Sequence, residues 1–301
     1  MNIEHSKTLC IILHHGSEEY TNKCINSLLN QKHLDIIILD NDPSQSYEPL
    51  AYARKSVKIF KTGGSAGFSE SNNIGVKAFL TKYHSSILIL NNDTIVSEGA
   101  LEYLLNTLNS SSVGAVGPCM PYTSHPNKIW ACGGNISKLR VSIGGIQPKH
   151  QHPYEVDYLP AAAILCRSDL WKEIGGFNEE YFIAYEEAEF ALEIKKRGFK
   201  VMVDPRSVIL HTVGMSNQIS AKYYYNSIRN RLIFSKYLYG KNIGFFYALI
   251  ITTLSFLNAR SLKNFLQRIK LWIKAISDDF NNVPIDRKIL QSITEQFKDS
   301  Y

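Results

Sequence analysis

The sequence predicts an α/β protein: a mostly parallel sheet flanked by helices, followed by a helical C-terminal appendage. Up to about residue 90, short apolar runs alternate with segments of helical period, which is typical of a parallel sheet covered on both faces. Polar residues follow these runs where strands would end, and ligands bind at that edge of such sheets. Beyond His211 the pattern is helical to the end of the chain.

The N-terminal half supplies most of the predicted strands. In chain order, the predicted elements are strands at 8–13, 35–39, 57–61 and 86–90, and helices at 20–30 and 69–83. A polar turn at 40–44 closes the second strand, and the glycine-rich stretch 63–67 follows the third. This stretch lacks the GxGxxG and GxxxxGK[ST] patterns, so we do not expect a dehydrogenase or an NTPase.

The middle of the chain is irregular. Residues 122–158 are rich in Gly, Pro and His and predict long loops with a hairpin around Gly144-Gly145. Long loops on an α/β scaffold often determine specificity. An apolar run at 159–166, an acidic helix and a strand at 200–203 then complete the predicted sheet.

Composition bounds the class of protein. The chain has 301 residues, enough for one main domain and a smaller appendage, and its apolar and charged fractions exclude wholesale disorder and a multi-pass membrane protein. The five cysteines are odd in number and lack metal-ligand spacing, so we expect reduced core residues. The first twelve residues do not resemble a secretory signal, which favours a cytosolic protein.

The acidic helix places one carboxylate among apolar residues. Phe190, Ala191 and Ile194 form its apolar stripe, and steps of three and four residues lead back to Glu187. Glu186 falls at the edge of the stripe, whereas Glu189 falls outside it and is expected in solvent. A buried carboxylate costs several kcal/mol unless it has a partner or a function, so Glu187 is a candidate functional residue.

A second candidate site follows the strand at 86–90. Asn91-Asn92-Asp93-Thr94 places one carboxylate at the edge of the sheet, where oxygen ligands suit Mg²⁺ or Mn²⁺. These residues are also common turn formers, so the motif alone is weak evidence.

Taken together, several motifs carry a family resemblance. They are IIILDNDPS at 36–44, GFSESNNIG at 67–75, ILNNDT at 89–94, GGFNEEYFIAYEEAEF at 175–190, His211 with Gly214 and Ser216, and Arg229-Asn230. From about Thr8 to Arg231 the chain resembles the family 2 inverting glycosyltransferases of the Rossmann-like GT-A fold, in particular the branch that contains bacterial rhamnosyltransferases of cell-surface polysaccharide synthesis.

The resemblance implies a site for a nucleotide-diphosphate sugar. Asp40 would contact the base or ribose, and segment 67–75 would border the nucleotide pocket. The candidate nucleotide-sugar residues are Asp40, Asn41, Gly67, Asn72, Asn73, Asn92 and Arg229.

The resemblance also implies a metal site. Asp93 matches the last carboxylate of the family's Asp-X-Asp element, and Asn91 stands at its first position, so one charged ligand fewer is expected for Mg²⁺ or Mn²⁺. His211 matches a histidine that can complete the metal and diphosphate site, although a histidine that merely caps a strand end is the alternative.

Glu187 matches the catalytic base of the family's Glu-Asp-X-Asp motif, in which both aspartates are replaced here. Displacing a catalytic carboxylate by one carbon–carbon bond can lower the reaction rate about 10²-fold. Either the pocket is adapted to Glu187, or Glu186 serves instead, or the chain is slow. The implied reaction is inverting transfer of a sugar, and the best single guess is transfer of L-rhamnose from the donor dTDP-rhamnose. The alternatives are another UDP- or GDP-sugar, or a non-catalytic glycan- or nucleotide-binding module.

The sequence divides the chain into two regions. Residues 1–215 form the predicted catalytic domain, with a nucleotide-sugar part at about 1–120 and an acceptor part at 121–215, and residues 216–301 form a basic helical region. Between Pro205 and Ser277 there are eleven Lys and Arg and no Asp or Glu. The basic character therefore belongs to one region, and its partner is expected there.

The basic region predicts contact with a membrane surface. Segment 242–259 has no charge but is diluted by polar residues, which favours a surface-lying or core-packed helix over a spanning one. Segment 262–274 has the pattern of an interfacial amphipathic helix. We therefore expect a cytoplasmic protein bound peripherally to the inner face of the cell membrane, with a polyprenyl-diphosphate-linked or polysaccharide acceptor; a homodimer is compatible with the sequence.

Nucleic-acid binding is the other use of a basic stripe, with Tyr223, Tyr224 and Tyr225 as candidate stacking residues. No nucleic-acid-binding fold accompanies them, so we do not expect a nucleic-acid partner.

Overall fold

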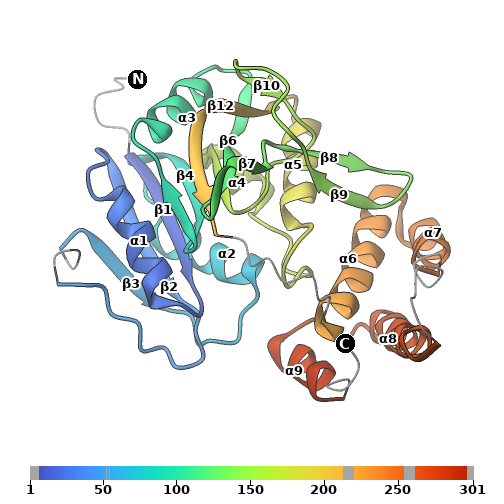
Figure 1. Ribbon diagram of the computed structural model, residues 1–301. Helices are drawn as coiled ribbons and strands as arrows, with labels where there is room; N and C mark the ends of the chain where they lie inside the picture. The colour runs from blue at the N-terminus through green and yellow to red at the C-terminus, as the bar shows by residue number, and fades with distance from the viewer. Residues whose placement is uncertain (1–6, 52, 54, 213–219, 254–261, 297–301) are drawn as a thin grey trace.

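A twisted mixed sheet forms the centre of the protein, in a computed structural model that describes residues 7–51, 53, 55–212, 220–253 and 262–296 (Figure 1). Its strand order is β10-β12-β6-β11-β4-β1-β2-β3, with β5 paired to β12 and β7 to β6. The strands are β1 (Lys7–His14), β2 (Leu34–Asp40), β3 (Val57–Lys61), β4 (His84–Asn91), β5 (Thr94–Val96), β6 (Val113–Tyr122), β7 (His125–Ala131), β10 (Tyr154–Glu155), β11 (Ala163–Arg167) and β12 (Lys200–His211). A separate hairpin pairs β8 (Gly134–Ser137) with β9 (Ser142–Gly145).

Four parallel strands bring the first candidate residues to one edge. β1 pairs with β2 and β4, and β2 pairs with β3, all in parallel. In this register His14 lies opposite Asp40, and Leu13 lies opposite Asn91. The polar residues that end β1, β2 and β4 therefore meet at the same edge of the sheet.

The other half of the sheet is mixed. β11 runs antiparallel between β4 and β6, and the long strand β12 runs parallel to β6. The end of β12 also pairs with the short strand β5, where His211 lies opposite Thr94. This pairing brings His211 next to the turn that contains Asp93.

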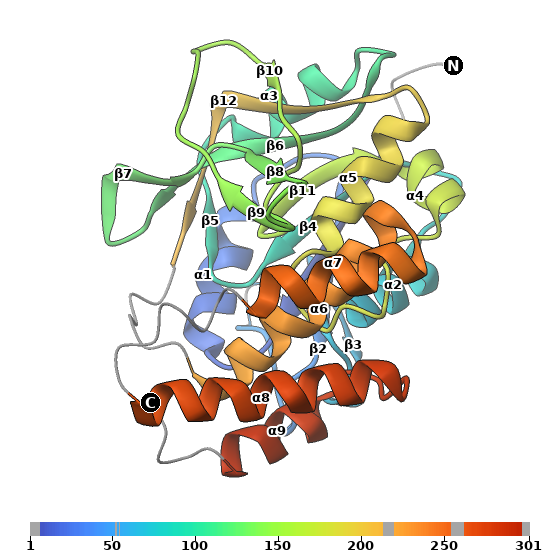
Figure 2. The same cartoon turned by 90° about the vertical axis from the view of Figure 1, so that its right-hand side faces the viewer.

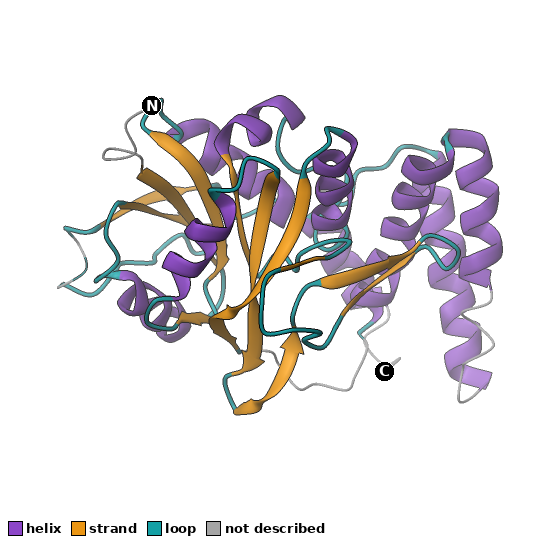
Figure 3. Ribbon diagram, turned by 90° about the horizontal axis from the view of Figure 1, so that it is seen from above, coloured by secondary structure: helices purple, strands orange, loops and turns teal. Residues whose placement is uncertain are grey.

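Helices cover both faces of the sheet (Figure 3). α1 (Glu18–Leu28) and α3 (Ala100–Leu108) contribute buried residues to one core cluster. α2 (Phe68–Phe79), α4 (Ser168–Ile174) and α5 (Glu186–Lys196) contribute to the cluster on the other face. All five cysteines are buried and free, as predicted.

The C-terminal helices form a group of their own beside the α5 side of the sheet (Figure 2). They are α6 (Ala221–Tyr239), α7 (Lys241–Thr253), α8 (Leu262–Phe280) and α9 (Arg287–Gln296). Their shared core includes Tyr225, Leu232, Ala248, Leu271 and Ile293. Among the residues that the structure describes, no helix is both long and apolar enough to cross a membrane.

Several sequence expectations are refined by the structure. The hairpin around Gly144-Gly145 is confirmed, but part of segment 122–158 pairs with the sheet as β7, and β6 and α3 were not predicted. The last strand continues beyond 203 to His211. The proposed boundary at 215/216, Gly214, Ser216 and residues 254–259 lie outside the described part of the chain.

Candidate active site

The turn after β2 is built by buried polar contacts. The Asp40 carboxylate is fully buried and accepts backbone N–H bonds from Asp42 and Tyr47, both at 3.2 Å. The Asn41 amide donates to the Ala66 carbonyl at 2.9 Å, and its oxygen accepts from the Thr62 hydroxyl at 2.6 Å. These contacts hold the turn against the glycine-rich stretch and shape the edge where the resemblance places the nucleotide.

The start of α2 packs against the loop before α5. A Cβ at Gly67 would lie 2.6 Å from the Phe182 carbonyl oxygen, so only glycine permits this approach. The Asn72 side chain is buried and donates to the Phe68 carbonyl at 2.9 Å. The Asn73 side chain makes two bonds to the Phe177 backbone, at 2.8 and 2.9 Å. Asn73 therefore fixes the loop that leads to α5.

Asp93 and His211 form the candidate metal pair. Asp93 Oδ1 lies 3.2 Å from His211 Nε2, and the Thr212 N–H donates to the Asp93 carbonyl at 2.8 Å. The Trp130 ring packs edge-on against the His211 ring, with centroids 4.4 Å apart. Asn92 donates to the Thr21 hydroxyl at 2.9 Å, so its side chain stabilises the turn.

The residues of this pair fit a divalent cation. Asp93 Oδ1 and His211 Nδ1 are buried and make no hydrogen bond in the described residues. The described residues hold no cluster of three or more His, Cys, Asp or Glu side chains that could bind a metal. The ligands that the resemblance implies are Asp93, His211 and the Asn91 amide, and of these His211 and Asn91 line one pocket. Mg²⁺ and Mn²⁺ suit such a sparse set, because they keep water and bind substrate phosphates at their other positions.

Two buried carboxylates begin α5. Glu186 and Glu187 are 1% and 8% exposed, and each has one carboxylate oxygen without a hydrogen-bond partner among the described residues. The two residues before them, Ala184 and Tyr185, have left-handed φ angles of 71° and 79°, a strained conformation for non-glycine residues. Both predicted carboxylates are thus buried, including Glu186 at the expected edge of the stripe.

Helix α6 holds this strained turn in place. The Asn226 and Asn230 amides both donate to the Ile183 carbonyl, at 2.9 and 2.8 Å. Asn230 also donates to the Ala184 carbonyl at 2.9 Å. These three bonds fix the segment from which Glu186 and Glu187 project.

Burial changes the ionisation of both carboxylates. It raises the pKa of Glu187 to about 7. It raises the pKa of Glu186 well above its ordinary value, and the neighbouring Glu187 raises it further. Near neutral pH the Glu187 carboxyl group therefore exchanges its proton readily.

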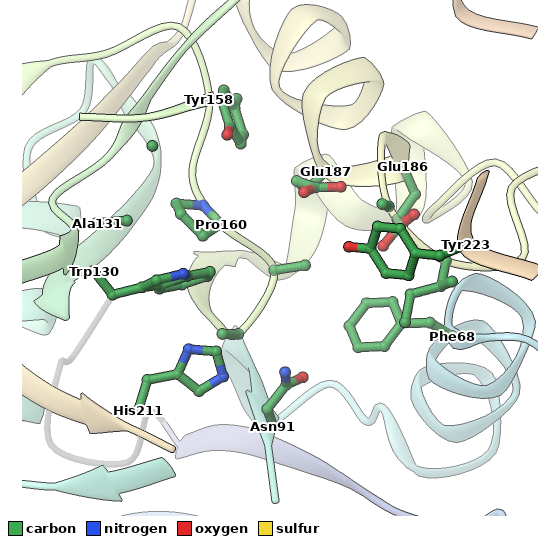
Figure 4. Close-up of a pocket in the computed structure, with 15 residues that line it drawn as sticks. Phe68, Asn91, Trp130, Ala131, Tyr158, Pro160, Glu186, Glu187, His211 and Tyr223 are labelled. Atoms are coloured by element: carbon green, nitrogen blue, oxygen red, sulfur yellow. The ribbon is translucent and has the colours of Figure 1, made fainter. Parts of the chain in front are cut away.

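A pocket of about 370 Å³ extends from the carboxylates to His211, the member of the metal pair that lines it (Figure 4). His211 and Asn91 lie at one end and Glu186 and Glu187 at the other. The other lining side chains are mostly apolar or aromatic and include Phe68, Trp130, Tyr158, Pro160 and Tyr223. Such a mixed lining suits a sugar, whose ring has apolar faces and polar hydroxyl groups.

The structure separates other candidates from this pocket. Asp40, Asn41, Asn72 and Asn73 do not line it and belong to the neighbouring edge and to α2. Arg229 is buried among the C-terminal helices, where it donates to the Tyr225 hydroxyl at 3.1 Å and the Val283 carbonyl at 2.7 Å.

Sequence analysis missed several residues of the site. Trp130 and Tyr158 line the pocket, but they fall in the irregular segment 122–158, where no motif or periodicity indicates a functional residue. Asn230 was part of the Arg229-Asn230 motif, but only Arg229 was singled out. Of the three tyrosines considered for nucleic-acid stacking, Tyr225 is fully buried and Tyr223 lines the pocket.

Glu189 also differs from the expectation of a solvated side chain. It is half-buried and accepts hydrogen bonds from the Tyr181 hydroxyl at 2.8 Å and the Asn178 amide at 3.1 Å.

Comparison with known proteins decides the family. A sequence profile described as glycosyltransferase like family 2 matches residues 8–230. The chain belongs to this family of glycosyltransferases. The predicted resemblance to family 2 is confirmed, including homologues named as rhamnosyltransferases.

The relatives of this glycosyltransferase are distant. Rhamnosyltransferase WbbL of Escherichia coli K12 is 24% identical over 223 residues, which cover 69% of this chain and 84% of the relative. The low-salt glycan biosynthesis hexosyltransferase Agl10 of Haloferax volcanii is 22% identical over 220 residues, 69% of each chain.

A solved structure confirms the predicted fold. The crystal structure of GalNAc-T7 with UDP, GalNAc and Mn²⁺ superposes with a TM-score of 0.61 at 13% identity, covering 91% of this chain and 58% of that one. The glycosyltransferase therefore has the GT-A fold, with a mostly parallel sheet flanked by helices.

Proposed function

We propose that this family 2 glycosyltransferase is a metal-dependent, inverting hexosyltransferase. It moves a sugar from a nucleotide-diphosphate donor to a lipid-linked or polymeric surface-glycan acceptor. The observation that carries the proposal is the pocket in which Glu187 faces the end occupied by His211 and Asn91. Opposed sites for a base and for a leaving group suit a single displacement, which inverts the anomeric configuration.

Glu187 is the proposed base. An acceptor hydroxyl is a poor nucleophile, and a base whose pKa lies near the working pH removes its proton most effectively. The pKa of Glu187, about 7, meets this condition, and its side chain is more accessible than that of Glu186. The free carboxylate oxygen of Glu187 is available to accept the proton. Glu186 is more deeply buried, and burial together with the neighbouring Glu187 favours its protonated form, which could donate a hydrogen bond to the substrate.

Asp93, His211 and Asn91 are the proposed ligands of Mg²⁺ or Mn²⁺. When bound, the cation would neutralise charge that develops on the leaving nucleoside diphosphate. The backbone of Asp93 is held by the bond from the Thr212 N–H, and His211 is held by β12 and the Trp130 ring. These contacts position the ligand atoms before substrate binds.

The donor proposed is dTDP-rhamnose; the likeness to the rhamnosyltransferase WbbL supports rhamnose as the sugar. Calorimetric titration of dTDP, UDP and GDP, each with and without Mn²⁺, tests the donor class and the metal site together. Metal-dependent binding of dTDP that Asp93→Ala abolishes is the expected result. Preference for UDP or GDP would replace rhamnose by another sugar, and no binding by wild type would favour a non-catalytic glycan-binding module.

The acceptor is proposed to be carried at the inner face of the cell membrane. On α7, Ile243, Phe246 and Ile250 share one helical face and are all more than half exposed. On α8, Leu266, Ile273 and Phe280 recur every seven residues and are also exposed. Exposed Lys241 and Lys270 accompany them, and anionic lipid attracts such residues by about 1 kcal/mol each.

This arrangement differs from the predicted amphipathic stripe of α8. Leu271 and Ala275 are the side chains of α8 that pack fully into the helical core, so Leu266 and Ile273 are left for another surface. Sedimentation of the full chain with vesicles of anionic lipid tests the proposal. Replacing both Phe246 and Ile250 by Ser should reduce binding by more than 10-fold, since a fully buried apolar side chain contributes roughly 1.5–3 kcal/mol and tenfold corresponds to about 1.4 kcal/mol. Tyr83→Ser, at an exposed aromatic on the N-terminal side, is the matched control; equal binding by all three proteins would refute membrane docking.

A further inference from the structure

Helix α9 reaches the donor edge of the sheet from the far end of the chain. Its first residue, Arg287, donates from Nη2 to the Asn41 carbonyl at 3.3 Å, across 246 residues of sequence. The other terminal nitrogen, Nη1, is buried and has no hydrogen-bond partner among the described residues. A buried guanidinium nitrogen without an acceptor indicates that an acceptor is supplied by something that binds.

Two further basic side chains belong to this region. His15 follows β1, and its Nδ1 lies 3.6 Å from Asp42 Oδ2. Lys222 is exposed on the first turn of α6. Burial lowers the pKa of His15, and the positive charges of Arg287 and Lys222 lower it further against the opposing effect of Asp42. The charges of Arg287 and Lys222, which come from two other segments of the chain, therefore both act on His15.

Asp42 offsets only part of the positive charge of this cluster. Its carboxylate oxygens already accept bonds from the Ser44 N–H, the Ser44 hydroxyl and the Gly16 N–H. These bonds lower the pKa of Asp42 to about 2, so the carboxylate stays ionised and is held in the turn that it stabilises. The single negative charge of Asp42 is thus outnumbered by the positive charges of Arg287 and Lys222, and the His15 imidazole can add a third when protonated.

The basic cluster adjoins the metal pair. The Asn92 amide donates to the His15 carbonyl at 3.4 Å, and Asn92 is the residue next to Asp93. Asn41, which contacts Arg287, directly follows the neighbouring strand β2. An anion that reaches from Asp93 toward Asn41 would pass beside His15 and Arg287.

We propose that Arg287, together with His15, binds the diphosphate of the nucleotide donor, with α9 supplying the central cation. A guanidinium group matches phosphate oxygens with two parallel N–H donors, which suits Arg287 Nη1 and Nη2. The proposal rests on the proposed function, because it requires a nucleotide-diphosphate ligand at this edge.

The local structure of α9 holds Arg287 in position. The preceding Asp286 accepts the Ile289 N–H at 2.7 Å and caps the helix. Ile285 packs into the main core, and Ile293 packs into the core of the C-terminal helices. The family profile ends at residue 230, so this contribution comes from a part of the chain that the profile does not cover.

Calorimetric titration of the full chain with nucleoside diphosphates and the matching nucleosides tests the proposal. Arg287→Ala should weaken binding of the preferred diphosphate roughly 10- to 100-fold, the effect of losing a charge-assisted hydrogen bond, and should leave nucleoside binding nearly unchanged. Arg287→Lys should restore part of the loss. Lys288→Ala, at the exposed neighbour on the same helix, should bind like wild type.

The outcomes separate this inference from the proposed function. Equal diphosphate binding by wild type and Arg287→Ala would overturn the inference alone. Tighter binding by Arg287→Ala would overturn it too and would show that α9 obstructs the site. Failure of wild type to bind any nucleoside diphosphate would sink the proposed function and this inference together. Matching urea midpoints without nucleotide would confirm that the variants are folded.

Discussion

Replacing Glu187 by Gln removes a buried ionisable group and should change how the stability of the protein depends on pH. Burial raises the pKa of Glu187 from 4.5 to about 7. Because the folded protein holds the proton more tightly than the unfolded chain, ionisation above pH 7 opposes folding. Below pH 4.5 both states are protonated and this cost is absent.

The size of the effect follows from the two pKa values. One pKa unit corresponds to about 1.4 kcal/mol, so ionising Glu187 lowers the free energy of unfolding by on the order of 3 kcal/mol. The cost grows between pH 4.5 and 7 and is complete above pH 7. An amide has a similar shape and no charge, so the Glu187→Gln variant should gain up to this amount over wild type at pH 8 and little at pH 5.

Urea unfolding at pH 5, 6, 7 and 8 measures this difference, because urea does not screen charges as guanidinium chloride does. Glu193→Gln on the same helix is a control of opposite sign. Burial raises the pKa of Glu193, but hydrogen bonds from Lys196, Tyr237 and Arg197 outweigh it and bring the pKa to about 2. Glu193 therefore stabilises the fold throughout pH 5–8, and its replacement should lower stability evenly. A Glu187→Gln difference that does not grow with pH would refute the reasoning.

Two further predictions concern catalysis. Asn230→Ala removes the donors to the Ile183 and Ala184 carbonyls, so it should lower kcat at least 10-fold while nucleotide affinity is retained. Asn226→Ala removes one of the two donors to Ile183 and should have the smaller effect. Equal kcat in wild type and both variants would contradict a positioning role. Because Glu187 must be ionised to accept a proton, kcat/KM should rise with pH and level off above about 7, whereas a flat profile from pH 5.5 to 8.5 would exclude it as the base.

Sequence patterns located the strand ends, because strongly apolar runs such as 8–13 and 35–39 can only be buried strands of this sheet. β6 was missed because its sequence, VGAVGPCMPY, contains two Gly and two Pro that resemble turn signals. α3 was missed because nine residues give little more than two turns of periodicity.

The candidate site was predictable only in part. Asp93 and His211 could be named from motifs, but their 3.2 Å approach depends on the pairing of β5 with β12. The burial of Glu186 follows from a left-handed turn at Ala184 and Tyr185, which helical periodicity does not reveal. Arg287 lies 246 residues from the turn it contacts, and no local pattern encodes such a contact.

The same limit applies to the face that α8 buries. Periodicity identified an apolar stripe in 262–274, but the fully buried positions, Leu271 and Ala275, are those that pack into the core shared with α6 and α7. Small residues such as Ala275 mark close helix approach, and hydrophobicity alone does not single them out.

The most direct test of the proposed mechanism is sugar transfer by wild type, Glu187→Gln and Glu193→Gln. Initial rates of dTDP release from dTDP-rhamnose would be measured with Mn²⁺ and a lipid extract from the source cells as acceptor. Glu187→Gln should lose about 10²- to 10⁴-fold in turnover while it binds dTDP like wild type, and Glu193→Gln should remain active. Unchanged turnover by Glu187→Gln would contradict the assignment of Glu187 as the base that drives transfer.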